Sequence, residues 1–262
     1  MSASWNWPSS RLKRGTVVST VKTKCGTAST VKTQMTVELT WYGHATWLIS
    51  TGEHKILLDP FFDESPTAPI KAAQAEADFI LVSHGHFDHI ADAASISKRT
   101  GAPVYAVYEV ANWLSANHGV ENANGMNIGG AIELPFGKLK MVPAIHSSGL
   151  PDGSYGGVAA GFLLKVGEKK IYFACDTALF SDMQLIGAVG LDVAVLPIGD
   201  LFTMGPADSV TAVDLLKPKT VLPSHYNTWP PIEQDAAGWA QSVTSKTKSI
   251  PVVLAPGESH TI

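Results

Sequence analysis

The sequence has little cysteine and no long apolar run. Its 262 residues include only Cys25 and Cys175, so a disulfide framework is excluded and a reducing compartment is permitted. No uninterrupted apolar stretch approaches the roughly 20 residues of a membrane-spanning helix. The glycine-rich stretch 149–157 lacks the lysine and the helix start of a phosphate-binding P-loop. These absences disfavour disulfide-stapled, membrane and P-loop proteins, and we expect a cytoplasmic protein without a membrane partner.

Acidic residues are missing from the first 34 residues, where six Lys or Arg stand beside twelve Ser or Thr. Such a segment cannot bury enough apolar surface to offset its ordering entropy. We therefore predict a disordered leader over 1–34 and one domain over 35–262. An organellar transit peptide, an overlong start before Met35 and a nucleic-acid tail are the alternatives, of which the overlong start is favoured.

The rest of the chain is acidic. Without the six basic residues of the leader, 13 of the 19 basic residues remain against 23 acids, a formal charge of −10 for residues 35–262. Such a surface repels phosphate backbones. We expect a small-molecule substrate and no nucleic-acid partner, and a homo-oligomer stays open.

Short apolar runs and turn residues alternate from Thr36 onward, which is typical of an α/β fold. Strands are expected at 37–41, 45–49, 56–58, 79–83, 104–107, 138–145, 158–166, 170–174, 193–197, 220–223 and 252–254. Helices are expected at 91–99, 110–117, 179–189 and 207–216, and a loop at 122–130. The alternation of helix and strand around 104–107 predicts a mostly parallel sheet in one layered domain.

Three histidines and an aspartate fall within six positions, His84-Gly85-His86-Phe87-Asp88-His89, directly after the apolar run 79–82. A polar surface turn explains one histidine more readily than three with a carboxylate between them. Histidine is the commonest metal ligand, and a loop at the carboxyl end of a strand lets alternate side chains converge. We therefore predict a metal site here.

Three further ligands are expected, because His146, Asp176 and His225 each follow another apolar strand directly or within two residues. The carboxyl ends of neighbouring strands share one sheet edge, where α/β proteins place their sites. Two divalent ions about 3.5 to 4 Å apart can activate a bridging hydroxide. We predict one ion on His84, His86 and His146, the other on Asp88, His89 and His225, and Asp176 as the bridge. Asp88 is also the predicted catalytic residue, which positions the nucleophile or accepts its proton.

Several loop motifs carry a resemblance to a known family. They are Gly43-His44-Ala45, Leu58-Asp59-Pro60, residues 126–130, Ala144-Ile145-His146-Ser147, residues 197–206 and His225-Tyr226-Asn227-Thr228. With the histidine motif they resemble the UPF0173 metal-dependent hydrolases of the metallo-β-lactamase superfamily, relatives of the ascorbate-6-phosphate lactonase group. The resemblance spans 35–262 and implies an αββα sandwich, two mixed sheets flanked by helices, with a binuclear site at one edge. It supports the same seven ligands.

The sequence departs from the family at two positions. Cys175 precedes Asp176 where the family usually has glycine, and Phe87 replaces a small residue. Phe87 is expected either to narrow access to the metals or to pack beneath them. Cys175 is expected to be a small buried core residue, with its side chain on the opposite face of a strand from Asp176.

Five other residues are candidates for supporting roles. Asp59 is expected to orient a ligand, with a turn-forming aspartate as the alternative, and the resemblance favours the site. His44 is expected to contact the substrate or a group that hydrogen-bonds to a metal ligand. The alternative is a structural histidine whose ring nitrogens are hydrogen-bonded within the fold. Tyr226 is a candidate donor to an oxyanion, and Asp200 and Thr203 are candidate pocket-lining residues.

The predicted function is hydrolysis of an ester, lactone, amide or phosphodiester of a small, anionic metabolite. An iron-dependent redox enzyme of the same fold, a nuclease subunit and a non-catalytic metal-binding sensor are the alternatives. Zinc is the expected metal, while manganese, iron and nickel stay open because affinity order alone does not select among them.

Overall fold

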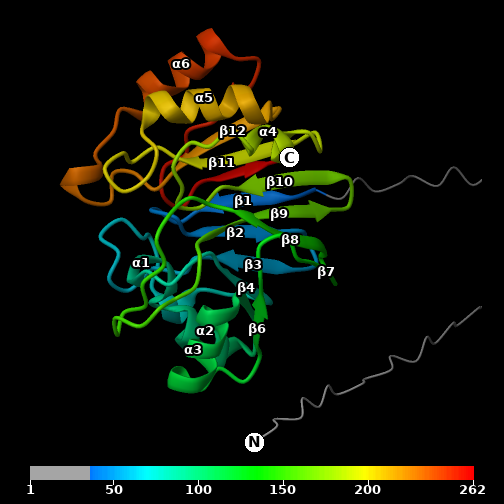
Figure 1. Ribbon diagram of the computed structural model, residues 1–262, viewed down its shortest axis with the longest axis vertical. Coiled ribbons are helices and arrows are strands. Elements are labelled where there is room, and N and C mark those ends of the chain that lie inside the picture. Colours follow the sequence, from blue (N-terminus) through cyan, green and yellow to red (C-terminus); the bar gives the residue numbers. More distant parts are fainter. Residues whose placement is uncertain (1–35) are drawn as a thin grey trace, which may run out of the picture. The chain divides into compact units, whose positions relative to one another are not determined.

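Residues 36–262 of the computed structural model form two seven-stranded sheets with helices outside them, an αββα sandwich (Figure 1). The predicted leader, 1–34, lies outside the described residues. The first sheet contains, in spatial order, β14 (Ser259–Thr261), β1 (Glu38–Trp41), β2 (Trp47–Ser50), β3 (Lys55–Leu58), β4 (Phe79–Val82), β5 (Val104–Val107) and β6 (Ala123–Met126). The second contains β13 (Ile250–Pro251), β12 (Thr220–Ser224), β11 (Val193–Pro197), β10 (Lys169–Phe173), β9 (Ala160–Val166), β8 (Gly137–Pro143) and β7 (Ala131–Leu134).

Both sheets are mixed in direction. Strands β14, β1, β2 and β3 pair antiparallel and β3 to β6 pair parallel. The second sheet repeats the arrangement, antiparallel from β7 to β10 and parallel from β10 to β13. The expectation of a mostly parallel sheet is therefore wrong, and the mixed sheets that the family resemblance implies are confirmed. The short turns of the first strands permit hairpins, whereas parallel neighbours need crossovers.

The helices cover the outer faces of the two sheets (Figure 1). The first sheet carries α2 (Ala93–Thr100) and α3 (Tyr108–His118), and the second carries α5 (Pro206–Leu216) with α6 (Ala236–Lys246) beside it. Two shorter helices, α1 (Phe87–Ile90) and α4 (Met183–Gly187), and the 3-10 turns Ala72–Gln74 and Pro230–Ile232 complete the fold. Within 36–262, no helix has the length and apolarity to cross a membrane.

The core lies between the sheets and is built from the inward faces of the strands. Trp47 on β2 is 1% exposed and packs on Phe173 of β10, with ring centroids 6.2 Å apart. Its indole Nε1 donates to the Ser224 hydroxyl at the end of β12, 3.0 Å away. A tryptophan that is buried with its N–H satisfied adds both apolar burial and a fixed orientation. This hydrogen bond joins β2 of the first sheet to the carboxyl end of β12 in the second sheet, next to the candidate site.

Several predicted elements need correction. Residues 122–130 were expected to be a loop, but β6 occupies Ala123–Met126, and 252–254 form no strand because the closing strands are β13 and β14. The predicted helices 91–99 and 179–189 shorten to α2 and α4. The strand β7 and the helix α6 were not predicted. Edge strands such as β6 and β14 form because they pair with a neighbouring strand, and their own sequences carry little of the apolar pattern that predicts a strand.

Candidate metal centre

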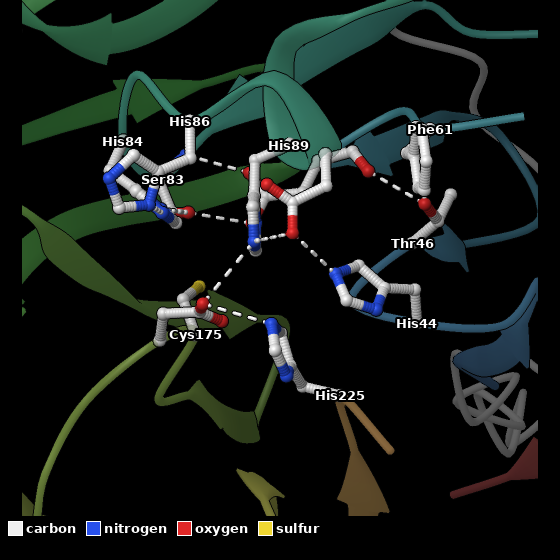
Figure 2. A network of polar contacts seen from close by, with 12 residues as sticks. His44, Thr46, Phe61, Ser83, His84, His86, His89, Cys175 and His225 are labelled. Atoms are coloured by element: carbon white, nitrogen blue, oxygen red, sulfur yellow. Dashed lines mark hydrogen bonds and ion pairs between the residues drawn. The ribbon is translucent and has the colours of Figure 1, made fainter. Parts of the chain in front are cut away.

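The histidine motif joins strand β4 to helix α1 at the edge of the first sheet (Figure 2). The predicted loop is right only for its first half, because Phe87 begins α1 and His86 is its N-cap. A helix start turns Asp88 and His89 toward the second sheet, whereas His84 stays at the strand end. His84 and His89 are both fully buried. Burial of several imidazoles together is expensive unless each has a partner.

One group of possible ligand atoms belongs to His84, His86 and His146. These atoms lie within 4.8 Å of one another, and His84 Nε2 is 2.9 Å from His86 Nδ1. The His146 ring lies 5.1 Å from each of the other two rings. The three residues that the sequence assigns to the first ion are thus brought together.

A second group contains Asp88, His89 and His225, and the structure adds His44 to it. Asp88 Oδ2 lies 2.9 Å from His44 Nε2 and 3.8 Å from His89 Nε2. His44 also places Nδ1 2.7 Å from the Thr228 hydroxyl. Both nitrogens of His44 are therefore engaged, which suits a residue that holds Asp88 in place better than a ligand. Thr228 was not singled out from the sequence.

Asp176 lies between the two groups. Its Oδ2 is 3.0 Å from His225 Nε2, 3.4 Å from His89 Nε2 and 3.6 Å from His146 Nε2. A single carboxylate that faces histidines of both groups has the position that a bridging ligand requires. All seven predicted ligand residues thus meet at one edge of the sandwich.

The donor atoms in this cluster are suited to a cation. Two atoms that face the cluster, His89 Nε2 and Asp176 Oδ1, are buried without a hydrogen-bond partner among the described residues. A buried polar atom that lacks a partner costs about 1 to 3 kcal/mol. Nitrogens and carboxylate oxygens are the ligands that zinc, iron and manganese take. The residues present fit a metal centre.

Asp59 and Ser83 fix the orientation of two histidines. The Asp59 carboxylate accepts from the Ser83 hydroxyl at 2.6 Å and the Ser83 amide at 2.7 Å, and its Oδ2 lies 2.9 Å from His89 Nδ1. The Ser83 hydroxyl lies 2.9 Å from His84 Nδ1. Protons on these Nδ1 atoms leave the Nε2 atoms of His84 and His89 free to bind metal. The orienting role expected of Asp59 matches this geometry, whereas Ser83 was missed.

The protonation states follow from burial and the surrounding charges. Burial lowers the pKa of His44 to about 3, with the neighbouring His225 acting in the same direction. Burial alone would raise the pKa of Asp88 and lower that of His89. The charge of His89, with the bond from His44, nevertheless holds the pKa of Asp88 below its usual range. The carboxylates of Asp176, Asp88 and Asp59 hold the pKa of His89 well above its usual range. Asp88 is therefore ionised and His44 neutral near pH 7.

Four residues at the site have left-handed backbone conformations. The φ angles are 50° at His44, 45° at Asp59, 53° at Cys175 and 54° at His225. The left-handed region costs a residue with a side chain roughly 1 to 2 kcal/mol. The His225 amide donates to the His44 carbonyl at 2.8 Å, which holds two of these turns against each other. Such strain is typical of functional sites where the surrounding fold fixes the geometry.

Cys175 does not occupy the strand position expected of it. It lies in the turn after β10, half-buried against the core, and its positive φ is a conformation that glycine adopts without strain. The positive φ explains why glycine suits position 175, where the family usually has it. Cys175 and Asp176 both line one small cavity and neither belongs to a strand, so the alternation expected of neighbours on a strand does not apply to them.

A pocket of about 790 Å³ opens above the candidate ligands. Its base is formed by five of them, His86, Asp88, His146, Asp176 and His225. Its walls are formed by Phe87, Ser147, Gly149, Leu150, Pro151, Phe202 and Trp229. Phe87 is 49% exposed and stands beside the ligands, so it narrows access and does not pack beneath them.

Three residues predicted for the pocket lie elsewhere. Tyr226 is buried in the core, where it stacks on Trp41 with ring centroids 5.1 Å apart, and it is not among the residues that line the pocket. Asp200 is exposed, and one of its carboxylate oxygens accepts from the Leu201 amide. Thr203 bonds to the Met204 carbonyl. The residue between them, Phe202, lines the pocket instead. The sequence offers no signal for this role of Phe202, because the exposure of its apolar side chain becomes known only from the fold.

Comparison with known proteins places the chain in a family. A beta-lactamase superfamily domain model matches residues 54–226. A UPF0173 metal-dependent hydrolase from Thermus thermophilus is 48% identical over 210 residues, which cover 80% of this chain and 92% of that protein. The chain belongs to the UPF0173 metal-dependent hydrolases. The homologue from Pelotomaculum thermopropionicum is 47% identical over 228 residues, covering 85% of this chain and 99% of its own.

A solved structure supports the same family. Igni18, a metallo hydrolase from Ignicoccus hospitalis, matches with a TM-score of 0.78 and 34% identity, over 87% of this chain and 98% of that one. The resemblance carried by the sequence motifs and the αββα fold are both confirmed. The chain is thus a metal-dependent hydrolase of the metallo-β-lactamase fold, with a His/Asp cluster that could hold metal.

Replacement of Asp59 with asparagine tests the orienting network. The amide keeps the shape but loses the charge that holds the His89 Nδ1 proton, so we expect metal affinity to fall about 10- to 100-fold. Titration of metal-free protein with a zinc indicator measures this. Asp214→Asn, which changes an exposed carboxylate on α5, is the matched control. Equal affinities in the two variants would contradict the role of Asp59.

Proposed function

We propose that the chain is a hydrolase that binds two divalent cations, zinc being the first candidate. His84, His86 and His146 would hold one ion, Asp88, His89 and His225 the other, and Asp176 would face both. The observation that carries the proposal is the position of Asp176, whose Oδ2 lies within 3.6 Å of histidines from both groups. When bound, two such ions polarise a carbonyl or phosphoryl oxygen and lower the pKa of water toward neutrality.

Asp88 is the proposed catalytic residue of this chain. It lines the pocket, it is ionised near pH 7, and His44 fixes its Oδ2 at 2.9 Å. A carboxylate in this position can orient the attacking water and accept its proton. His44, held in turn by Thr228, restricts Asp88 to one orientation, which is the contribution of positioning to catalysis. The scissile bond would belong to an ester, lactone, amide or phosphodiester of a small molecule.

The test combines metal content with turnover. Protein reconstituted separately with zinc, manganese and iron would be assayed against lactones, esters, amides and phosphodiesters. Single His84→Ala and Asp88→Ala variants are expected to bind fewer ions and to lose hydrolysis. His118→Ala, at an exposed histidine outside the cluster, should match the parent protein. Full metal content together with full hydrolysis in either site variant would refute the proposal. Oxygen uptake by the iron form without hydrolysis would favour a redox enzyme.

A further inference from the structure

One wall of the pocket is a rigid aromatic surface. Phe61 is 1% exposed and meets the ring of Phe87 edge-on, at 5.7 Å and 87°, and the ring of Trp229 at 6.0 Å. The rings of Phe87 and Trp229 are 6.3 Å apart. Phe61 therefore acts as a buried support, while Phe87 and Trp229 face the pocket. Aromatic rings held in this way form a preorganised apolar surface that loses little entropy on binding.

Another part of the pocket lining is also apolar, and it is fixed by hydrogen bonds. It is formed by Leu150 and Pro151. The Gly85 amide donates to the Ser148 hydroxyl at 3.0 Å, and that hydroxyl donates to the Gly156 carbonyl at 2.8 Å. A side chain at Gly85 would come within 3.0 Å of Leu150, so the wall packs directly on the histidine motif. This wall is already in place before a substrate arrives.

Charge is confined to the base of the pocket. Of the residues that the structure describes, none that lines the pocket is a lysine or arginine, and Phe202, 56% exposed, forms a third apolar side. Ser147 is the one polar wall side chain, and its hydroxyl lies 3.3 Å from His86 Nε2. A charged group buried against these walls would lose its hydration without gaining a partner. The anionic metabolite expected from the sequence is thus poorly matched to the walls.

The residues that line the pocket also determine whether the leaving group can be protonated. Apart from the candidate ligands and Ser147, the described wall residues carry no side chain that exchanges a proton. An amine leaving group must be protonated to depart, whereas an alcohol or a phenol can depart as its anion and take up a proton afterwards. The wall residues are therefore sufficient for cleavage of an ester carbon–oxygen bond, which needs no proton donor other than water.

We propose that this pocket takes neutral carboxylic esters, lactones included, that carry an aromatic or other apolar ring. This inference rests on the proposed hydrolytic function and names its substrate class. Water supplies the oxygen that bonds to the acyl carbon, the ester carbon–oxygen bond breaks, and the proton of water ends on the released alcohol. The reacting carbonyl would lie over the base, and the ring would lie between Trp229, Phe87 and Phe202.

The experiment compares substrates that differ in the charge of the ring, in the presence of the ring or in the bond that is cleaved. The metal-loaded protein would be assayed with phenyl acetate, the anionic 4-acetoxybenzoate, methyl acetate, acetanilide and bis(4-nitrophenyl) phosphate. We expect phenyl acetate to have the highest kcat/KM, about 10-fold or more above that of 4-acetoxybenzoate, whose phenol leaving group is of similar acidity. Calorimetry with acetophenone and 4-acetylbenzoate, which share the ketone and differ in the charge on the ring, gives a readout without turnover, in which acetophenone should bind more tightly.

Variants of Phe202 locate the effect in the pocket. Phe202→Ala should lower kcat/KM for phenyl acetate about 10-fold. Phe202→Arg should shift the preference toward 4-acetoxybenzoate. The control is Leu185→Ala, which removes an exposed apolar side chain from α4 away from the pocket and should match the parent.

The outcomes separate the two proposals. Hydrolysis that favours the charged or the ring-free ester, or that is unchanged in both Phe202 variants, would overturn the substrate class and leave the hydrolase intact. Absence of hydrolysis with every member of the panel would count against the hydrolase. In that case acetophenone binding stronger than 4-acetylbenzoate binding still supports an apolar pocket, and the reverse order overturns it.

Discussion

Replacement of Asp176 with asparagine is expected to lower kcat/KM by about a thousandfold, which corresponds to about 4 kcal/mol of transition-state stabilisation. The carboxylate lies within 3.6 Å of His89, His146 and His225, and its Oδ1 is buried. Asparagine preserves the shape, but its neutral amide cannot bridge two cations, and its NH₂ group would face the centre. Asp176 is the one residue shared by both proposed ion sites, so its loss should affect both.

Two measurements check this expectation. Metal analysis of the purified variant should find fewer ions per chain than in the parent protein, and steady-state kinetics should place the loss in kcat/KM. Asp214→Asn serves again as the control, because it removes an exposed carboxylate from α5. A variant with the parent's metal content and activity would show that Asp176 does not bridge the groups.

Removal of the metals is expected to reduce thermal stability strongly. A ligand present at about a thousand times its Kd stabilises the folded state by about 4 kcal/mol. For a domain of this size, that amounts to about 8 to 16 °C in Tm for each ion. Without metal, the buried His89 Nε2 and Asp176 Oδ1 atoms are left without partners in the described part of the chain.

Differential scanning calorimetry with and without a chelator measures the shift. Zinc added after the chelator is dialysed away should restore the original Tm. The His84→Ala variant should show a smaller shift, since one of its proposed ion sites is incomplete. An identical Tm in the presence and absence of chelator would indicate that the folded chain binds no metal tightly.

The candidate ligands were predictable because each follows an apolar strand. Polar residues at strand ends are conspicuous in the sequence, and the carboxyl ends of adjacent strands converge in space. For this reason His146 and His225, far from the histidine motif in the chain, were placed correctly beside it. Asp59 was recoverable for the same reason, since it follows β3 directly.

The supporting residues were harder to predict because their roles depend on the fold. Nothing local distinguishes Ser83 from any serine that follows a strand, yet its hydroxyl contacts both Asp59 and His84. Tyr226 adjoins His225 in sequence, but its ring turns to the core, whereas Trp229 three positions later reaches the pocket. Side-chain direction in irregular segments follows from backbone conformation, which alternation patterns do not describe.

The strands set a further condition on the centre, because each ion-binding group takes residues from both sheets. His44 and the histidine motif belong to the first sheet, while His146, Asp176 and His225 follow strands of the second. Neither layer contains a complete set of ligands. Bound ions would therefore link the two sheets to each other. A core substitution that shifts one sheet against the other would separate the ligands and lower the affinity for the ions.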